Sequence, residues 1–342
     1  MRLVIDAREA FAAQKAGKGQ WTYGFLHELL TRDVDCTVLT DTPTQNATVL
    51  PSGFAFHKAA ASFVKHNGGL YISPTSFVVP FLLGASHPYI PIVHDMIAFR
   101  SDPHDLKATM LERLLLPRTV KHAAHICTVS SATRSDLLQR YPRLDEHMVT
   151  SIFAGPMVEH VPLSLPDGKT ILCIGTLCPR KNQQQLIAAY ASLPDALRKQ
   201  YRLVLVGGRG WHDDSIVCYA ENTKGVEWKN YVSDEEYQQL LSSATVFAYP
   251  SLYEGFGMQV LDAMQRGIPV LTSDKGSLAE VAGNAAVIVD PTQERSIASG
   301  LMSLLEDEDL RTALSRQGPS QAAQFTWKQT VDIFLEVAQM CV

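Results

Sequence analysis

Long apolar runs, a signal segment and an excess of basic residues are all missing from this 342-residue sequence. The longest apolar run, Phe77 to Ala85, is interrupted by Pro80 and is far too short to span a bilayer. The first residues lead directly into an expected strand, without the apolar region of a signal peptide. The net charge of −5 argues against a general attraction to nucleic acid. These features predict a cytoplasmic protein with no nucleic-acid partner, and they leave open a peripheral contact at the inner face of the membrane.

Cysteine is scarce, and clustered metal ligands are missing. The six cysteines are scattered along apolar strand-like runs, and Cys173 and Cys178 do not have the spacing of a metal pair. This pattern predicts reduced, buried thiols rather than a disulfide framework. The acidic run Glu306–Asp309 lies at the end of a helical pattern and is typical of a solvated face. We therefore predict no metal site.

The length favours two domains of about 150 residues each. Short apolar runs alternate with amphipathic segments, which is typical of parallel sheets covered by helices. The pattern predicts a first α/β domain over residues 1–160, a proline-bearing linker over 161–168 and a second α/β domain over 169–325. An amphipathic helix over 326–342 would complete the first domain. Doubly wound domains bind ligands outside the carboxyl ends of their strands, so facing domains would place an active site in the cleft between them.

The segment Ser251–Asp262 follows an expected strand and places Glu254 and Asp262 on either side of a glycine-broken helix start. Gly255 and Gly257 allow a close approach, and the helix start presents backbone N–H groups and the positive end of a dipole. N–H groups at such a position bind phosphate or sugar oxygens, and carboxylates accept sugar hydroxyls. A nucleotide sugar is such a ligand. The alternative is a solvated carboxylate pair at a helix start.

A second segment, Ile174–Asn182, leaves the first strand of the second domain and enters a helix at Gln183. It carries a basic pair, Arg180 and Lys181, which suits the negative charge that develops on a departing nucleoside diphosphate. A basic pair in a loop is otherwise an ordinary surface feature.

These two segments resemble the signature of the retaining glycosyltransferases of family 4, and the resemblance extends over nearly the whole chain. Two glutamates flank seven residues in that family, whereas the second here is Asp262, and Gln259 stands where a proline is usual. The resemblance implies the fold called GT-B: two facing Rossmann-like doubly wound domains, with a C-terminal helix returning to the first. The first domain would take the acceptor and the second would bind the donor.

The resemblance also assigns roles to residues. Glu254, His94, Arg180 and Lys181 would be catalytic, with His94 reaching the donor sugar. Asp262 would hold the ribose hydroxyls, and Asp95 would orient the His94 ring or cap the next segment. A metal-binding role for His94 is the other reading. Gly17 and Gly19 would form a glycine-rich loop that lets the diphosphate and the acceptor come close. The remaining donor contacts are assigned to Gly255, Phe256, Gly257 and Met258.

The implied reaction moves a hexose from a nucleoside-diphosphate sugar to a glycan or lipid-linked acceptor, with retention of configuration and without a required metal or other cofactor. GDP-mannose is the expected donor. A catalytically silent homologue that binds a sugar nucleotide is one alternative. A sugar-nucleotide epimerase or a phosphorylase on the same architecture is another.

Residues 100–143 are basic, with eight Lys/Arg against four Asp/Glu, in a chain that is acidic overall. The helix predicted over Leu106–His122 carries the apolar stripe Leu106, Met110 and Leu114. This region could contact an anionic membrane that carries the acceptor. The favoured alternative packs the stripe into the first domain and leaves the basic residues solvated.

Overall fold

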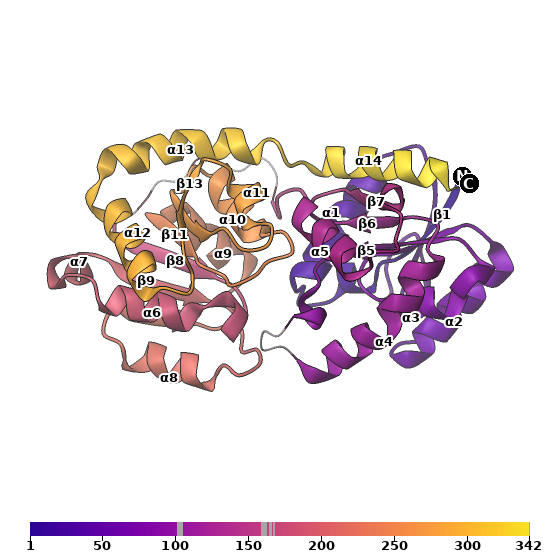
Figure 1. Cartoon of the computed structure of the whole chain (residues 1–342), viewed down its shortest axis with the longest axis horizontal. Coiled ribbons are helices and arrows are strands. Elements are labelled where there is room, and N and C mark those ends of the chain that lie inside the picture. The colour runs from indigo at the N-terminus through magenta and orange to yellow at the C-terminus, as the bar shows by residue number, and fades with distance from the viewer. Residues whose placement is uncertain (101–104, 159–162, 164–165, 167, 342) are drawn as a thin grey trace. The chain divides into compact units, whose positions relative to one another are not determined.

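The computed structural model describes residues 1–100, 105–158, 163, 166 and 168–341. The chain divides into two compact units. The first comprises Met1–Ser101, Asp105–Met157 and Phe325–Val342, and the second comprises Val158–Gln324. Both units are α/β layers built on a parallel sheet (Figure 1).

The sheet of the first unit has the strand order β3-β2-β1-β4-β5-β6-β7. The chain runs outward from β1 to β3 and then returns to the other side of β1 with β4, so the topological switch point lies between β1 and β4. The strands are β1 (Arg2–Asp6), β2 (Asp35–Thr40), β3 (Ala47–Val49), β4 (Leu70–Ser73), β5 (Tyr89–Val93), β6 (Ile126–Thr128) and β7 (Val149–Ser151). The helices are α1 (Gly17–Leu29), α2 (Phe54–Asn67), α3 (Val78–Leu83), α4 (Leu106–His122), α5 (Ser131–Arg140) and α14 (Trp327–Met340).

The second sheet repeats this winding with the order β10-β9-β8-β11-β12-β13, and its switch point lies between β8 and β11. Its strands are β8 (Thr170–Ile174), β9 (Arg202–Val206), β10 (Val226–Lys229), β11 (Val246–Tyr249), β12 (Val270–Ser273) and β13 (Ala286–Val289). Its helices are α6 (Gln183–Ala191), α7 (Asp195–Gln200), α8 (Asp214–Asn222), α9 (Asp234–Ser243), α10 (Met258–Gln265), α11 (Leu278–Ala282), α12 (Glu294–Glu306) and α13 (Glu308–Ala322).

Side-chain caps set the starts of several helices. The Ser130 hydroxyl accepts from the Thr133 amide at the start of α5, and Ser233 accepts from the Glu236 amide at the start of α9. Such caps satisfy amides that have no partner inside the helix. Asp307, which the sequence analysis placed in a solvated acidic run, caps α13 in the same way.

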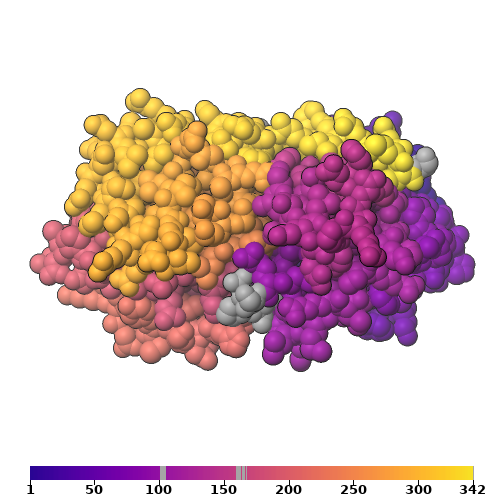
Figure 2. Space-filling view, viewed as in Figure 1, coloured from indigo at the N-terminus to yellow at the C-terminus, as the bar shows by residue number. Residues whose placement is uncertain are grey.

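The last helix, α14, belongs to the first unit, where it contacts α1; its yellow ribbon and atoms lie along that unit in Figures 1 and 2. Its indole, Trp327, fills a notch whose walls are Gly24 and Gly155. A Cβ atom at Gly24 would lie 2.2 Å from that ring, and one at Gly155 would lie 2.6 Å from it. The indole N–H donates to the Pro156 carbonyl at 2.8 Å. The predicted return of the C-terminal helix to the first domain is therefore confirmed.

The predicted doubly wound α/β fold is confirmed, and the helix predicted over Leu106–His122 is α4 with the same bounds. Several elements were not predicted from the sequence: the edge strands β3 and β10 and the helices α2, α3, α7, α8 and α13. Of the predicted linker, residues 161, 162, 164, 165 and 167 lie outside the described residues. All six cysteines are free thiols. Across the described residues, no helix has the length and apolar character needed to cross a bilayer.

Candidate active site

The switch point of the second sheet brings together three of the predicted site residues. The segment after β8 carries Arg180 and Lys181, and the segment after the neighbouring strand β11 carries Glu254. The Glu254 carboxylate oxygen Oε1 lies 2.8 Å from Arg180 Nη1 and 2.7 Å from Lys181 Nζ. Glu254 and Lys181 are buried. Residues far apart in the sequence therefore form one buried ion cluster, which the basic pair and the glutamate considered separately did not predict.

The charges in this cluster control one another. Burial opposes ionisation of Glu254, but the positive charges of Arg180 and Lys181 outweigh that effect and lower its pKa to about 2. Burial, together with the Arg180 charge, lowers the pKa of Lys181 in spite of the attraction of Glu254. At neutral pH the carboxylate is ionised, and two buried or half-buried cations share it.

The tight turn that carries the cations depends on Asn182. This residue has a φ of 62°, in the left-handed region that asparagine tolerates better than most residues. Its buried amide Nδ2 donates to the Pro250 carbonyl at 3.0 Å and to the Pro291 carbonyl at 2.7 Å. The Leu252 amide donates to the Arg180 carbonyl at 2.8 Å. The turn after β8 is thus fastened to the segment after β11.

Tyr249, at the end of β11, is a site residue that the sequence analysis did not select. Its hydroxyl is hydrogen-bonded to the Lys181 ammonium and lies 3.3 Å from Gln259 Oε1. Burial, and then the negative charge of Glu254, raises the pKa of this tyrosine well above its usual range. Gln259, which stands where a proline is usual in the family, thus connects to the ion cluster through Tyr249. A tyrosine immediately before Pro250 was the only sequence signal for this contact.

The glycine-rich segment after Glu254 leads into α10 as predicted. Gly257 is the N-cap of α10 and has a φ of 106°, which an L side chain rarely adopts. Phe256 and Met258 are buried. The Ser277 hydroxyl lies 2.6 Å from the Phe256 carbonyl, to which it donates. The segment Gly255–Met258 is therefore a fixed turn at the N-terminal end of a helix, where a dipole favours anions.

Asp262 lies one helical turn further along α10, and its side chain is fully buried. The Tyr237 hydroxyl, on α9, donates to Asp262 Oδ2 at 3.1 Å. The structure therefore places Asp262 on the helix that the fixed turn begins, with its carboxylate held by a neighbouring helix. Tyr237 is a second site residue that could not be selected from the sequence, since nothing in its local pattern distinguishes it from other helix positions.

In the first unit, His94 follows β5 and reaches the end of the neighbouring strand β4. Its Nε2 lies 2.7 Å from the Pro74 carbonyl, which can only accept, so Nε2 carries a proton. Burial, and then the charge of Lys18, lowers the pKa of His94 to about 3. The ring is therefore neutral at pH 7, and its Nδ1 is an acceptor. Trp21 meets the ring edge-on, with centroids 5.2 Å apart.

Asp95, the next residue, is hydrogen-bonded to the backbone of the following segment. Its Oδ1 accepts from the Ile97 amide at 3.0 Å, at the start of a short 3₁₀ turn over Ile97–Phe99. Asp95 also acts on the Lys18 ammonium. Burial opposes the positive charge of Lys18, but the negative charges of Asp95 and Glu112 outweigh burial and raise the pKa of Lys18. Across the described residues, no group of three or more His, Cys, Asp or Glu side chains is arranged to hold a metal ion.

The predicted glycine loop at Gly17 and Gly19 is not a loop. Helix α1 already begins at Gly17, so both glycines lie in its first turn. Glycine occupies position 19 because of packing: a Cβ atom there would lie 2.6 Å from the Glu9 carbonyl oxygen. Nothing lies within 4 Å of the corresponding position at Gly17. Of these two glycines, Gly17 is thus the one with open space beside it.

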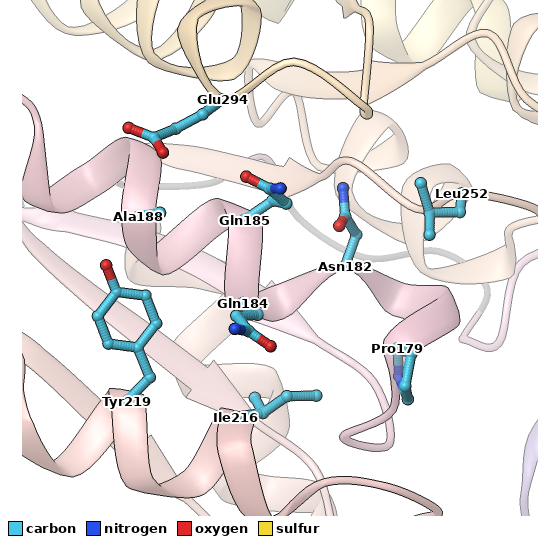
Figure 3. Close-up of a pocket in the computed structure, with 9 residues that line it drawn as sticks. All are labelled: Pro179, Asn182, Gln184, Gln185, Ala188, Ile216, Tyr219, Leu252 and Glu294. Atoms are coloured by element: carbon cyan, nitrogen blue, oxygen red, sulfur yellow. The ribbon is translucent and has the colours of Figure 1, made fainter. Parts of the chain in front are cut away.

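A surface pocket of about 660 Å³ lies beside the ion cluster but does not contain it (Figure 3). Helices α6 and α8 form most of its wall, with Gln184, Gln185, Ile216 and Tyr219 among the lining residues. Asn182, Pro179 and Leu252 also line it. The pocket therefore shares the turn that carries the cations, while Arg180, Lys181 and Glu254 are not among its lining residues.

The sequence of the second unit matches a known family. Residues 159–321 match the family described as Glycosyl transferases group 1. The chain is 34% identical over 238 residues to O-antigen chain mannosyltransferase B of Escherichia coli, covering 64% of this chain and 62% of that protein. It is 27% identical over 266 residues to O-antigen chain mannosyltransferase RfbU of Salmonella typhimurium, covering 77% of this chain and 72% of that protein.

Solved structures resemble the fold of this chain over nearly its whole length. The sucrose-phosphate synthase of Thermosynechococcus elongatus matches with a TM-score of 0.80 at 17% identity, covering 99% of this chain and 98% of that one. HepE of Anabaena, solved in complex with UDP-glucose, matches with a TM-score of 0.78 at 16% identity, covering 98% of each chain. WaaG, a glycosyltransferase involved in lipopolysaccharide biosynthesis, matches with a TM-score of 0.70 at 15% identity, covering 98% of this chain and 99% of that one. The sequence of residues 159–321 is therefore similar to the glycosyl transferases group 1, in a chain that has the α/β fold called GT-B.

Proposed function

We propose that this chain is a retaining mannosyltransferase that moves mannose from GDP-mannose to a glycan or lipid-linked acceptor. The observation that carries the proposal is the buried cluster of Glu254, Arg180 and Lys181 at the switch point of a group 1 domain. The donor sugar is inferred from relatives whose names specify mannosyl transfer. The likeness to family 4 supports retention and independence from metal.

In this proposal the cations neutralise the leaving group. Breaking the bond between the sugar carbon C1 and the phosphate oxygen leaves its electron pair on the nucleoside diphosphate. Arg180 offers two parallel N–H donors to phosphate oxygens, and Lys181 offers a compact charge. The N-terminal end of α10, entered through Gly257, adds backbone N–H groups of the same polarity. The departing phosphate takes the proton of the acceptor hydroxyl, which forms the new bond to C1 on the same face.

Glu254 has two parts in this scheme. In the structure its carboxylate is shared by Arg180 and Lys181, so the bound diphosphate shares these cations with it. Because Lys181 is also held by Tyr249, its ammonium stays in place while its anionic partner changes. Glu254 then offers its oxygens to the hydroxyls of the sugar. Asp262, with its carboxylate held by Tyr237, is assigned to the ribose.

In this proposal the first unit binds the acceptor, and His94 contacts the sugar. The neutral ring, with Nε2 bound to Pro74, offers Nδ1 as an acceptor for a sugar hydroxyl. The cytoplasmic location, and the domain boundaries predicted at 1–160 and 169–325, remain predictions within this proposal.

Nucleotide selectivity tests the proposal. The purified chain is unfolded thermally with GDP, UDP, ADP, TDP and CMP, each with and without magnesium. A nucleotide at a hundred times its dissociation constant stabilises the folded state by about 2.7 kcal/mol. We expect a shift with GDP that does not depend on magnesium, and, in a separate assay, transfer of labelled mannose to a glycan or lipid-linked acceptor. Conversion of the donor without an acceptor would instead identify an epimerase, and GDP binding without turnover would identify a silent homologue.

A further inference from the structure

Helix α4 leaves an apolar stripe uncovered. Leu106, Met110 and Leu114 are 77%, 72% and 67% exposed, and the adjacent Leu111 is 49% exposed. The first three are spaced four residues apart, so they lie along one face of the helix. The sequence analysis favoured packing of this stripe into the first domain, and that prediction was wrong.

The stripe is exposed because a different face of α4 does the packing. Leu115, Leu116 and Val120 are buried and belong to the hydrophobic core cluster that also contains Val93 and Ile126. Figure 1 shows α4 at the edge of the first unit, beside α3. The helix is therefore apolar on two sides, and the second apolar side is not needed for the core.

Basic residues flank the exposed stripe. Lys107 lies seven residues before Leu114, and Lys121 lies seven residues after it, which places both lysines on the stripe's side of the helix. Both lysines are exposed. The one acidic residue of the helix, Glu112, lies on another face and pairs with Lys18 at 3.3 Å. In a chain of net charge −5, this face is both apolar and positive.

We propose that this face of α4 docks on an anionic lipid surface. The helix would lie in the plane of the interface, with the four apolar side chains among the acyl chains and Lys107 and Lys121 against lipid phosphates. Charge complementarity selects this occupant. Contact between two copies of the face would oppose lysine to lysine, whereas an anionic bilayer pairs each lysine with a negative charge. The role of the surface, bringing the enzyme to a lipid-linked acceptor, rests on the proposed function, but docking itself does not.

The test is flotation of the full chain with vesicles of phosphatidylcholine, alone or with about one quarter phosphatidylglycerol. We expect the wild-type chain to float with the anionic vesicles at low salt and to dissociate at high salt. The combined variant Leu106→Ser, Met110→Ser, Leu114→Ser should lose flotation. Each of Lys107→Glu and Lys121→Glu should lower partitioning at least about fivefold.

Met340 provides a matched control, because it is a helical methionine of the same unit with 69% exposure. Met340→Ser should float like the wild type, whereas Met110→Ser should bind more weakly. All variants should keep the wild-type melting temperature, since only exposed side chains change. Equal flotation with neutral vesicles, no flotation, or concentration-dependent dimers that the triple variant abolishes would each overturn the proposal. GDP-dependent stabilisation is measured separately, so failure of docking does not count against the proposed transferase.

Discussion

The Lys181 ammonium lies 2.7 Å from the Glu254 carboxylate, and both side chains are buried at the carboxyl ends of adjacent strands. Replacing the carboxylate by an amide of the same size removes the shared anion and leaves the cations uncompensated. We expect Glu254→Gln to lower the free energy of unfolding by about 3 kcal/mol. Urea unfolding measures this loss, and GDP should recover part of it because its phosphates replace the missing charge.

The control for that variant is Glu227→Gln. Glu227 is exposed and lies 3.7 Å from Arg202, so its pairing is screened by solvent. The free energy of unfolding should change by less than about 1 kcal/mol. Equal losses in the two variants would show that the buried cluster contributes nothing special.

Lowering the pH from near neutrality should lower the free energy of unfolding. The pKa of His94 falls from 6.5 to about 3 on folding, so the unfolded state binds a proton that the folded state excludes. Stability is therefore complete above pH 6.5 and falls as the pH is lowered from there toward 3, by up to about 1.4 kcal/mol per pH unit. His57 and His125, whose pKa values are also lowered, contribute in the same direction.

His94→Gln isolates the share of His94, because glutamine can still donate to the Pro74 carbonyl. Urea unfolding at about pH 7.5, 6 and 5, which covers the upper part of this pH range, should show a weaker dependence of stability on pH in the variant. If the free energy of unfolding depends on pH as it does in the wild type, His94 does not contribute to the loss of stability in acid. Glu254, whose pKa falls from 4.5 to about 2, adds a separate loss of stability between those values.

Tyr237 should matter more than its partly exposed helix position suggests. Tyr237→Phe removes the hydroxyl that donates to the fully buried carboxylate of Asp262. A hydrogen bond to a buried charge contributes about 2 kcal/mol, and we expect a loss of that size in stability together with weaker GDP binding. Tyr231→Phe, at an exposed tyrosine of the same unit, is the matched control and should change neither quantity. Calorimetric titration with GDP compares the two variants.

Alanine substitutions at Gly17 and Gly19 should distinguish a packing role from a contact with the ligand. Gly19→Ala forces a Cβ atom to within 2.6 Å of the Glu9 carbonyl and should destabilise the chain. Gly17→Ala meets no atom within 4 Å and should raise stability by about 0.5 kcal/mol, since alanine favours helix. If the proposed diphosphate approaches this helix start, Gly17→Ala will nevertheless lose transfer activity. A stable and fully active Gly17→Ala chain would remove Gly17 from the proposed site.

Central strands and capped helices could be predicted because their signals are local. The helix predicted over Leu106–His122 agrees with α4 residue for residue, and the helix predicted to start at Gln183 is α6. Strands β3 and β10 lie at sheet edges, where one side has no neighbouring strand and a continuous apolar run is not required. Helix α13 contains Gly318 and Pro319, which weaken the helical pattern near its end.

The contacts of the site could not be predicted in the same way. The sequence placed Arg180, Lys181 and Glu254 at the ends of two strands, but only the strand order makes those strands neighbours. The roles of Tyr249 and Tyr237 depend on which side chain lies opposite, and that depends on packing between elements. The burial of Asp262 is likewise a tertiary property. The exposure of the α4 stripe could not be predicted, because periodicity marks an apolar face without showing what covers it.

The seating of Trp327 between Gly24 and Gly155 has a consequence for the order of synthesis. The ribosome makes the chain from its amino terminus, and α14 follows the whole second unit. Residues 168–324 of the second unit follow one another in the chain and can fold as they emerge. The first unit waits, with Trp21 and Phe25 lacking the aromatic partners that α14 supplies, until that helix is released. The half of the protein made first is thus the half completed last, and its aromatic core stays incomplete until the end of translation.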